Sequence, residues 1–220
     1  MEPLLHLEGI HKHYPGPSGS VSVLRGVDIA LPPGSFTALL GSSGCGKSTL
    51  LSIAGGLLTP DAGTAKVNGE DLFAGNARDR ARKRGRLVGF VFQRFHLLPY
   101  LTVEENVMSA SLGRGERVSV EAARKRLDRL GMTERLQHRP GQLSAGEQQR
   151  VAVARAMAHG AKLLLADEPT GNLDEENAAI ILNAFADFAA AGGTVLMVTH
   201  ERPVAARAGS EFILKDGALL

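Results

Sequence analysis

A glycine-rich segment of the chain has the residue types and the spacing of a phosphate-binding loop. Gly41–Ser48 reads GSSGCGKS and matches the pattern G-x-x-x-x-G-K-S/T at every fixed position. Glycines let backbone N–H groups converge on phosphate oxygens, and the N-terminus of a following helix adds its positive dipole. Lys47 would then reach the β- and γ-phosphates of a nucleotide, while the Ser48 hydroxyl would bind Mg²⁺. The predicted nucleotide-binding residues of this loop are Gly41, Ser42, Ser43, Gly44, Cys45, Gly46, Lys47, Ser48 and Thr49.

The position of this loop in the chain agrees with its chemistry. Residues 35–40 form a short apolar segment that predicts a strand, and the run from Leu50 to Leu57 suits a buried helix. Phosphate loops of this pattern lie between a strand and a helix. An ordinary glycine-rich turn that carries a lone lysine is the alternative, and the complete pattern in this context disfavours it.

A pair of acidic residues follows a second apolar strand. Asp167 and Glu168 come directly after the run Leu163–Ala166. Asp167 would hold Mg²⁺, and Glu168 would orient or deprotonate the attacking water. Acidic residues often follow buried strands, so this prediction depends on the phosphate loop upstream.

The segment Leu143–Arg150 has two interpretations. Ser144 and Glu147 have the spacing of a capping box, so the segment is explained by an ordinary helix start. A glycine-containing helix start is also a potential second phosphate site. One small domain has little need of two such sites for one nucleotide, but both would serve if a second copy of the chain faced the first.

Taken together, these motifs resemble those of the ATP-binding subunits of ABC transporters, in the order of that family and over nearly the whole chain. In the family's terms they are Walker A at Gly41–Ser48, the Q-loop at Phe92-Gln93, the signature at Leu143–Glu147, Walker B at Leu163–Glu168, the D-loop at Gly171–Asp174 and the switch histidine at His200.

The resemblance implies roles for residues that would serve the nucleotide bound by the same chain. Tyr14 would stack on adenine, although a plain turn residue is the alternative. Gln93 would contact Mg²⁺, sense the γ-phosphate and link a helical insertion to the core. His200 would contact the γ-phosphate and hold Glu168 and the attacking water in place.

Other residues would serve the nucleotide of an opposite copy. Ser144 and Gly146 would bind its γ-phosphate, and Asp174 would help to join the two sites across the dimer. Two positions depart from the usual signature. Ala145 stands where the family places a second glycine, so its methyl group would crowd the phosphate, and Glu147 replaces the commoner glutamine.

Two further segments are candidate contact surfaces. The apolar cluster Phe95–Leu101 is either part of the core of the helical insertion or, as the resemblance implies, the cleft that receives a membrane permease subunit. The basic run from Arg78 to Arg86 favours a solvated helix face, with contact to anionic lipid as the alternative. Nucleic acid is disfavoured because no aromatic residues interleave with the basic ones.

Composition limits the class of protein. The chain has 220 residues, a formal net charge of +2 and one cysteine. The small charge argues against a protein that is held on nucleic acid mainly by phosphate charge. A single cysteine cannot form an internal disulfide, and no apolar run approaches the roughly 18–20 residues that span a bilayer. Because the N-terminus also lacks the pattern of a secretory signal, we expect a soluble cytosolic protein.

The elements that position these residues predict an α/β fold. The first third of the chain reads as strands, residues 97–160 as helices, and the last third as alternating strands and helices. Asn68-Gly69 is a hairpin signal, and Ser119 has the residue type to cap a helix. The resemblance refines this to a P-loop NTPase with a RecA-like parallel sheet, an antiparallel β subdomain and an α-helical insertion. We expect one ABC ATPase domain over residues 1–220, with 1–93 and 159–220 as the nucleotide-binding core and 94–158 as the helical subdomain.

The resemblance also implies a function. Two copies would sandwich two ATP molecules with Mg²⁺ and drive a separate integral membrane subunit, from a peripheral position on the cytoplasmic face of the cell membrane. The short chain and the sequence Gly171-Asn172-Leu173-Asp174 are similar to the group that includes lipoprotein-release, macrolide-export, haem-export and cell-division types, which favours an exporter or extractor. The alternatives are mechanotransmission without transport and a soluble ABC ATPase.

Overall fold

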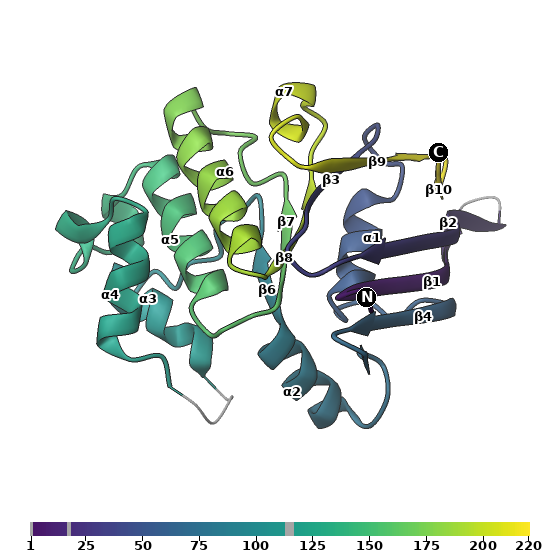
Figure 1. The fold of residues 1–220 in the computed structure, drawn as a ribbon, viewed down its shortest axis with the longest axis horizontal. Coiled ribbons are helices and arrows are strands. Elements are labelled where there is room, and N and C mark those ends of the chain that lie inside the picture. The colour runs from purple at the N-terminus through teal and green to yellow at the C-terminus, as the bar shows by residue number, and fades with distance from the viewer. Residues whose placement is uncertain (1, 17–18, 113–116) are drawn as a thin grey trace.

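A computed structural model describes residues 2–16, 19–112 and 117–220 of the chain. A six-stranded sheet in the order β10-β9-β3-β8-β7-β6 forms its centre, and Figure 1 shows this sheet between helices on one side and a second sheet on the other. Its strands are β3 (Phe36–Leu40), β6 (Val88–Val91), β7 (Leu163–Asp167), β8 (Thr194–Val198), β9 (Ser210–Lys215) and β10 (Ala218–Leu219).

The central strands pair in parallel, and only the β9–β10 hairpin is antiparallel within the described part of this sheet. β3 and β8 are buried at every residue, as expected for parallel strands that are covered on both faces. The carboxyl ends of β3, β7 and β8 therefore lie side by side at one edge. Ligands of open α/β sheets bind at such an edge.

The second sheet is antiparallel and has the order β2-β1-β4-β5. Its strands are β1 (Leu5–Gly16), β2 (Gly19–Leu31), β4 (Ala62–Val67) and β5 (Glu70–Asp71). The turn between β4 and β5 has positive φ at both Asn68 and Gly69, 52° and 75°, which is the turn that an Asn-Gly pair favours. The hairpin predicted there is confirmed.

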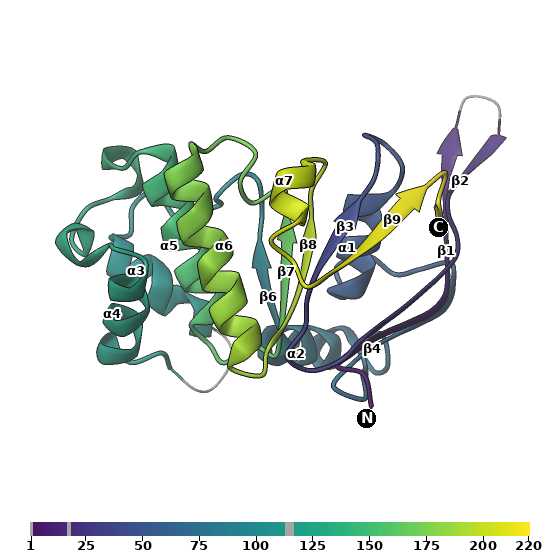
Figure 2. The same ribbon diagram turned by 45° about the horizontal axis from the view of Figure 1, so that its top comes forward.

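The helices divide between the two faces of the central sheet. Their bounds are α1 (Lys47–Ala54), α2 (Ala77–Leu87), α3 (Val103–Met108), α4 (Val120–Arg129), α5 (Ala145–Met157), α6 (Glu175–Ala190) and α7 (Arg202–Ala205), with short 3-10 turns at Ser109–Ser111, Thr133–Arg135 and Pro140–Gln142. α3, α4 and α5 gather on the side away from the antiparallel sheet, whereas α1 lies between the two sheets (Figures 1 and 2).

Two hydrophobic clusters follow from this layering. The first cluster packs the helices from α3 through α6 against one face of the central sheet, and it includes Phe185 and Val151. The second packs α1 against the antiparallel sheet, and it includes Leu50 and Leu7. The expected fold class is confirmed by this arrangement. Among the residues that the structure describes, no helix has both the length and the apolar content to cross a bilayer.

Helix starts agree with the expected capping residues. Ser144 and Glu147 form a capping box at α5, in which the Ser144 Oγ accepts from the Glu147 N–H at 3.2 Å and the Glu147 Oε2 accepts from the Ser144 N–H at 2.8 Å. Ser119 caps α4 by accepting from the Ala122 N–H at 3.1 Å. Short-range pairs of this kind depend on local spacing, which is why the sequence predicts them well.

Candidate active site

The predicted phosphate loop lies between β3 and α1, where its glycines are structurally required. Gly44 and Gly46 have φ of 79° and 108°, a region that side chains disfavour. A Cβ at Gly46 would also lie 2.9 Å from the Val23 carbonyl oxygen. The Lys47 side chain folds back into the loop, where its Nζ donates to the carbonyl oxygens of Gly41 at 2.8 Å and Ser42 at 2.9 Å.

The loop opens onto a cavity of about 620 Å³, a size usual for ligand sites. Residues from five separate segments line it: Val23, Ser43, Gly44, Gly46, Lys47, Ser48, Thr49, Gln93, Asp167, Glu168 and His200. The structure therefore brings together the predicted loop, the acidic pair, the glutamine and the histidine, although they are far apart in the chain.

Asp167 ends β7 and faces the loop. Burial raises the pKa of the Asp167 carboxyl above its ordinary value, a hydrogen bond with Ser48 opposes this rise, and the charge of Glu168 adds to it. A hydroxyl and a carboxylate oxygen beside each other are hard donors of the kind that Mg²⁺ prefers. No group of three or more His, Cys, Asp or Glu side chains in the described residues is arranged to hold a metal ion. The donor set suits an ion that keeps water or phosphate oxygens as further ligands.

Glu168 is held in an unusual conformation. Its φ of 46° places a non-glycine residue in the left-handed region, where its N–H donates to the Val198 carbonyl at 3.0 Å. The Glu168 Oε1 lies 2.8 Å from the His200 Nδ1, and this contact raises the pKa of His200. The Glu168 Oε2 is buried without a hydrogen-bond partner within the described chain. Glu168 lines the cavity, and an oriented carboxylate at such a place can accept a proton from water.

Gln93 follows β6, and Gln149, which is not among the predicted site residues, supports the segment that carries it. The Gln149 Nε2, on α5, donates to the Pro169 carbonyl at 2.9 Å and to the Phe92 carbonyl at 3.3 Å. Gln149 thereby connects the signature helix α5 to the segment that carries Gln93 and to the segment that carries Asp167 and Glu168. No sequence signal marks Gln149, because its neighbours Gln148 and Arg150 are polar as well.

The signature end of α5 lies outside this cavity. Ser144, Gly146 and Asp174 are not among the lining residues, and Ser144 and Asp174 are exposed. Residues that contact a nucleotide bound by a second copy of the chain must lie outside the cavity of their own chain, as these do. Asp174 caps α6 by accepting from the Asn177 N–H at 2.8 Å.

The remaining predicted nucleotide contacts are less directly placed. Tyr14 lies near the end of β1 with 38% of its surface exposed, and the Lys12 Nζ lies 5.8 Å from its ring centroid. It does not line the cavity, so adenine stacking stays a prediction. Gly41, Ser42 and Cys45 belong to the loop but do not line the cavity. Cys45 is buried, and a Cβ at Gly41 would lie 2.6 Å from its Sγ.

The segment Phe95–Leu101 is partly buried and partly exposed, and docking of a membrane subunit on it stays a prediction. Leu97 packs against the core of the helical layer, whereas Tyr100 has 67% of its surface exposed. Arg155 of α5 holds the backbone of this segment, because its guanidinium donates to the carbonyls of Phe95 at 2.9 Å and His96 at 2.6 Å.

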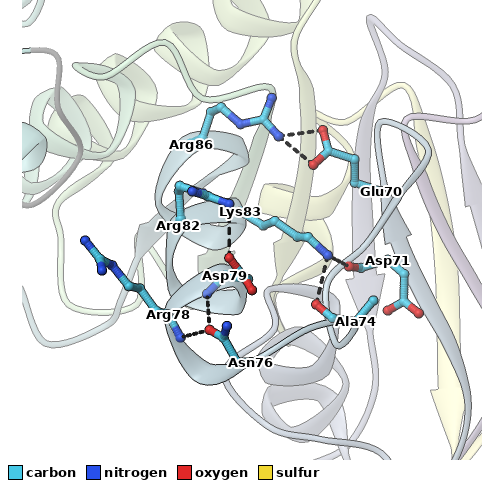
Figure 3. A network of polar contacts seen from close by, with 9 residues as sticks. All are labelled: Glu70, Asp71, Ala74, Asn76, Arg78, Asp79, Arg82, Lys83 and Arg86. Carbon is cyan, nitrogen blue, oxygen red and sulfur yellow. Dashed lines mark hydrogen bonds and ion pairs between the residues drawn. The ribbon is translucent and has the colours of Figure 1, made fainter.

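The basic run forms α2, and much of its charge serves local structure (Figure 3). Lys83 donates to the carbonyls of Asp71 at 2.8 Å and Ala74 at 2.9 Å, and Arg86 pairs with Glu70 at 2.5 Å. These contacts fasten α2 to the β4–β5 hairpin. They support the helix-face interpretation over contact with lipid.

Comparison with known proteins decides the family. A family model described as ABC transporter matches residues 24–171. The chain belongs to the ABC transporter family. It is an ATP-binding ATPase with the P-loop fold of the transporter cassettes.

Relatives of this ABC ATPase extend the match to the whole chain. It is 47% identical over 222 residues to the lipoprotein-releasing system ATP-binding protein LolD of Ruegeria pomeroyi, with 99% of this chain and 97% of that protein covered. It is 42% identical over 221 residues to the macrolide export ATP-binding/permease protein MacB of Chlorobium phaeobacteroides. The match covers 100% of this chain but only 34% of MacB.

A solved relative has the same fold. The dimeric structure of MJ0796, a bacterial ABC transporter cassette, has a TM-score of 0.90 and 32% identity, with 98% of this chain and 96% of that chain covered. A dimeric post-hydrolysis state of MJ0796, bound to ADP and Pi, has a TM-score of 0.87 and 35% identity.

Proposed function

We propose that two copies of this ABC ATPase enclose two ATP molecules and that their closure and reopening drive a separate membrane subunit. The single observation that carries this proposal is the cavity in which Lys47, Asp167, Glu168 and His200 meet, while the signature lies outside it. The phosphates of a nucleotide in that cavity would remain accessible to the signature residues of a second copy.

The cavity residues divide the chemistry between them. Lys47 would exchange its two carbonyl contacts for the β- and γ-phosphates, since a phosphate binds an ammonium more strongly than a neutral carbonyl does. Ser48 and Asp167 would hold Mg²⁺, with Gln93 reaching it from β6. The ion would neutralise charge on the phosphates. The raised pKa of Asp167 fits a carboxyl that favours a nearby cation.

Glu168 and His200 would act on the attacking water. The carboxylate of Glu168 would accept the proton as the water oxygen attacks the γ-phosphorus, and the bond to the ADP oxygen would break. His200 would hold Glu168 through Oε1 and contact the γ-phosphate. Backbone N–H groups of the loop would stabilise the charge that develops.

The opposite copy would complete each site. Ser144 and Gly146 lie at the N-terminus of α5, so they would present a hydroxyl and the positive helix dipole to the partner's γ-phosphate. Asp174 would join the two sites across the interface. Tyr14 would stack on adenine.

The membrane partner would dock on the segment Phe95–Leu101. In this segment Tyr100 is exposed, and hydrogen bonds from Arg155 hold the backbone. Residues 94–158 would form a helical subdomain that moves against the core, within one domain over residues 1–220. The relatives named for lipoprotein release and macrolide export favour an export or extraction motor. The ATPase would sit peripherally on the cytoplasmic face of the membrane, without nucleic acid.

The test uses Glu168→Gln, which keeps the shape of the side chain but removes its basicity. We expect steady-state ATP hydrolysis to fall by at least about 100-fold, the lower range for loss of a general base. Light scattering after gel filtration should then show a dimer with Mg-ATP and a monomer with Mg-ADP. The matched control is Glu211→Gln on β9, an exposed glutamate far from the loop in sequence. Undiminished hydrolysis by Glu168→Gln, or a monomer with Mg-ATP, would overturn the proposal.

A further inference from the structure

Asn177 connects two segments that face the second copy. It lies in the first turn of α6, three residues after the capping residue Asp174. The Asn177 Nδ2 donates to the Asp174 Oδ1 at 3.0 Å and to Oδ2 at 2.8 Å, in addition to the backbone bond from the Asn177 N–H to Oδ1 at 2.8 Å. Both carboxylate oxygens of Asp174 are therefore held by one residue, and the pKa of Asp174 is lowered first by the backbone bond and then by the amide.

The same amide packs against the signature glycine. A Cβ at Gly146 would lie 2.5 Å from the Asn177 Oδ1 and 2.8 Å from its Nδ2, closer than real Cβ atoms approach other atoms. Gly146 is buried, and α5 packs beside α6 there. The backbone of the signature turn thus rests directly on the amide that holds Asp174.

An N-terminal cap alone does not require this arrangement. A capping side chain needs to accept only from backbone N–H groups of the first turn. The hydroxyls of Ser144 and Ser119 cap their helices in this way. At α6 the side-chain amide adds two bonds to the carboxylate and a tight contact with a different helix. A rigid contact between two packed elements transmits a shift of one to the other, because packed interiors deform little.

We propose that Asn177 is a positioning residue that makes the signature turn and the D-loop of one subunit move as a unit. The inference rests on the proposed function, in which both segments face the partner. In a two-fold dimer, Gly146 of each copy would touch the ATP of the other, and Asp174 would lie between the two sites. Asn177 then couples the two nucleotides, so that ATP bound at one site prepares the other.

The first test measures cooperativity. Asn177→Leu keeps a side chain of similar size but removes the amide, and we expect the Hill coefficient of ATP hydrolysis to fall from about two to about one. Binding of a fluorescent ATP analogue to the monomer and the thermal midpoint should change little. The matched control is Asn183→Leu on the same helix, where the side-chain Oδ1 accepts from the Arg207 guanidinium at 2.7 Å. It should leave the Hill coefficient unchanged.

The outcomes separate the inference from the proposed function. If the wild-type chain hydrolyses ATP cooperatively and folded Asn177→Leu does so equally, the coupling role is wrong while the ATPase motor stands. A wild-type Hill coefficient of one also overturns the coupling role. Absence of ATP-dependent dimerisation in Glu168→Gln contradicts the proposed function itself.

The second test is a rescue that does not depend on turnover. In the Glu168→Gln background, Gly146→Ala should prevent the ATP-dependent dimer, because its methyl group collides with the Asn177 amide. Adding Asn177→Ala removes the colliding Cγ, Oδ1 and Nδ2 atoms and should restore the dimer measured by light scattering. Failure of the second substitution to restore it, or dimerisation by Gly146→Ala alone, would overturn the contact on which the inference depends.

Discussion

The two phosphate-related regions of the chain differ in how complete they are. The loop cavity is assembled from five segments, and its lysine, with only 8% of its surface exposed, already has two hydrogen-bond partners. The signature end of α5 is equally well formed, but its serine is exposed and its polar groups are satisfied within its own capping box. The first region is a site within one chain, and the second is a surface prepared for another.

This difference has a physical cause. The cavity lies at the carboxyl ends of parallel strands, where backbone direction and two loops converge without help from a partner. The start of α5 is a single helix end, and a single helix end offers donors on one side only. Substitutions that disrupt one region and leave the other intact should therefore have different effects.

The largest effect is expected from Lys47→Ala. Because the lysine would stabilise charge on the phosphates, we expect ATP hydrolysis to fall by at least about 1,000-fold and nucleotide affinity by at least about tenfold. Binding of a fluorescent nucleotide and phosphate release measure the two effects. Lys66→Ala, at an exposed position of β4, is the control and should keep both values. Retention of nucleotide binding by Lys47→Ala would contradict its role.

A smaller and more selective effect is expected from Ser144→Ala. The variant should bind nucleotide normally as a monomer, whereas the ATP-dependent dimer in the Glu168→Gln background should weaken by about tenfold, the loss of one good hydrogen bond. Ser119→Ala is a close control, because it removes an equivalent cap from α4. Both should lower the free energy of unfolding by about 1 kcal/mol. Equal ATP-dependent dimerisation by Ser144→Ala and Ser119→Ala would show that Ser144 does not contact the partner's nucleotide.

Ala145→Gly tests the departure from the usual signature. Its side chain is exposed at the first position of α5, so the methyl group points away from the core. We expect the free energy of unfolding to fall by less than the roughly 0.5–1 kcal/mol that glycine costs in a helix interior, because residue 145 is the first of the helix. The ATP-dependent dimer should become tighter, which a titration of dimer mass against ATP would reveal. A weaker dimer would show that the methyl group does not crowd the interface.

The smallest effect concerns the contact between His200 and Glu168. The pKa of His200 is raised from 6.5 in the folded chain, so the pair stabilises the fold below that pH and ceases to do so as pH rises through the folded pKa. The thermal midpoint of the wild type should exceed that of His200→Gln at low pH. The difference should vanish at high pH, and it should be small because the histidine side chain is 65% exposed. A difference that grows with pH would contradict the pairing.

The sequence predicted the features that depend on neighbouring residues. The phosphate loop, the caps at Ser119 and Ser144 and the turn at Asn68 each follow from short-range spacing or backbone preference. The motif order then supplied the fold, through a resemblance to a family rather than through periodicity alone. Contacts made by Gln149 with two distant carbonyls had no such signal, because they depend on tertiary packing.

The same limit applies to the rest of the site. The left-handed backbone at Glu168 is imposed by its bond to β8, and no residue type predicts it. The pairing of Asn177 with Asp174 was foreseeable from a spacing of three residues. Its contact with Gly146 was not, because that contact requires α5 and α6 to pack side by side.

The central claim is that the signature of one copy meets the phosphate loop of the other. It is tested most directly by a disulfide between Ser43→Cys and Ala145→Cys in one chain that also carries Cys45→Ser and Glu168→Gln, so that no other thiol is present. Mild oxidation with Mg-ATP should join two chains covalently, and with Mg-ADP it should not. An ATP-dependent dimer in which the disulfide forms only within single chains, or forms between chains regardless of nucleotide, would contradict the account.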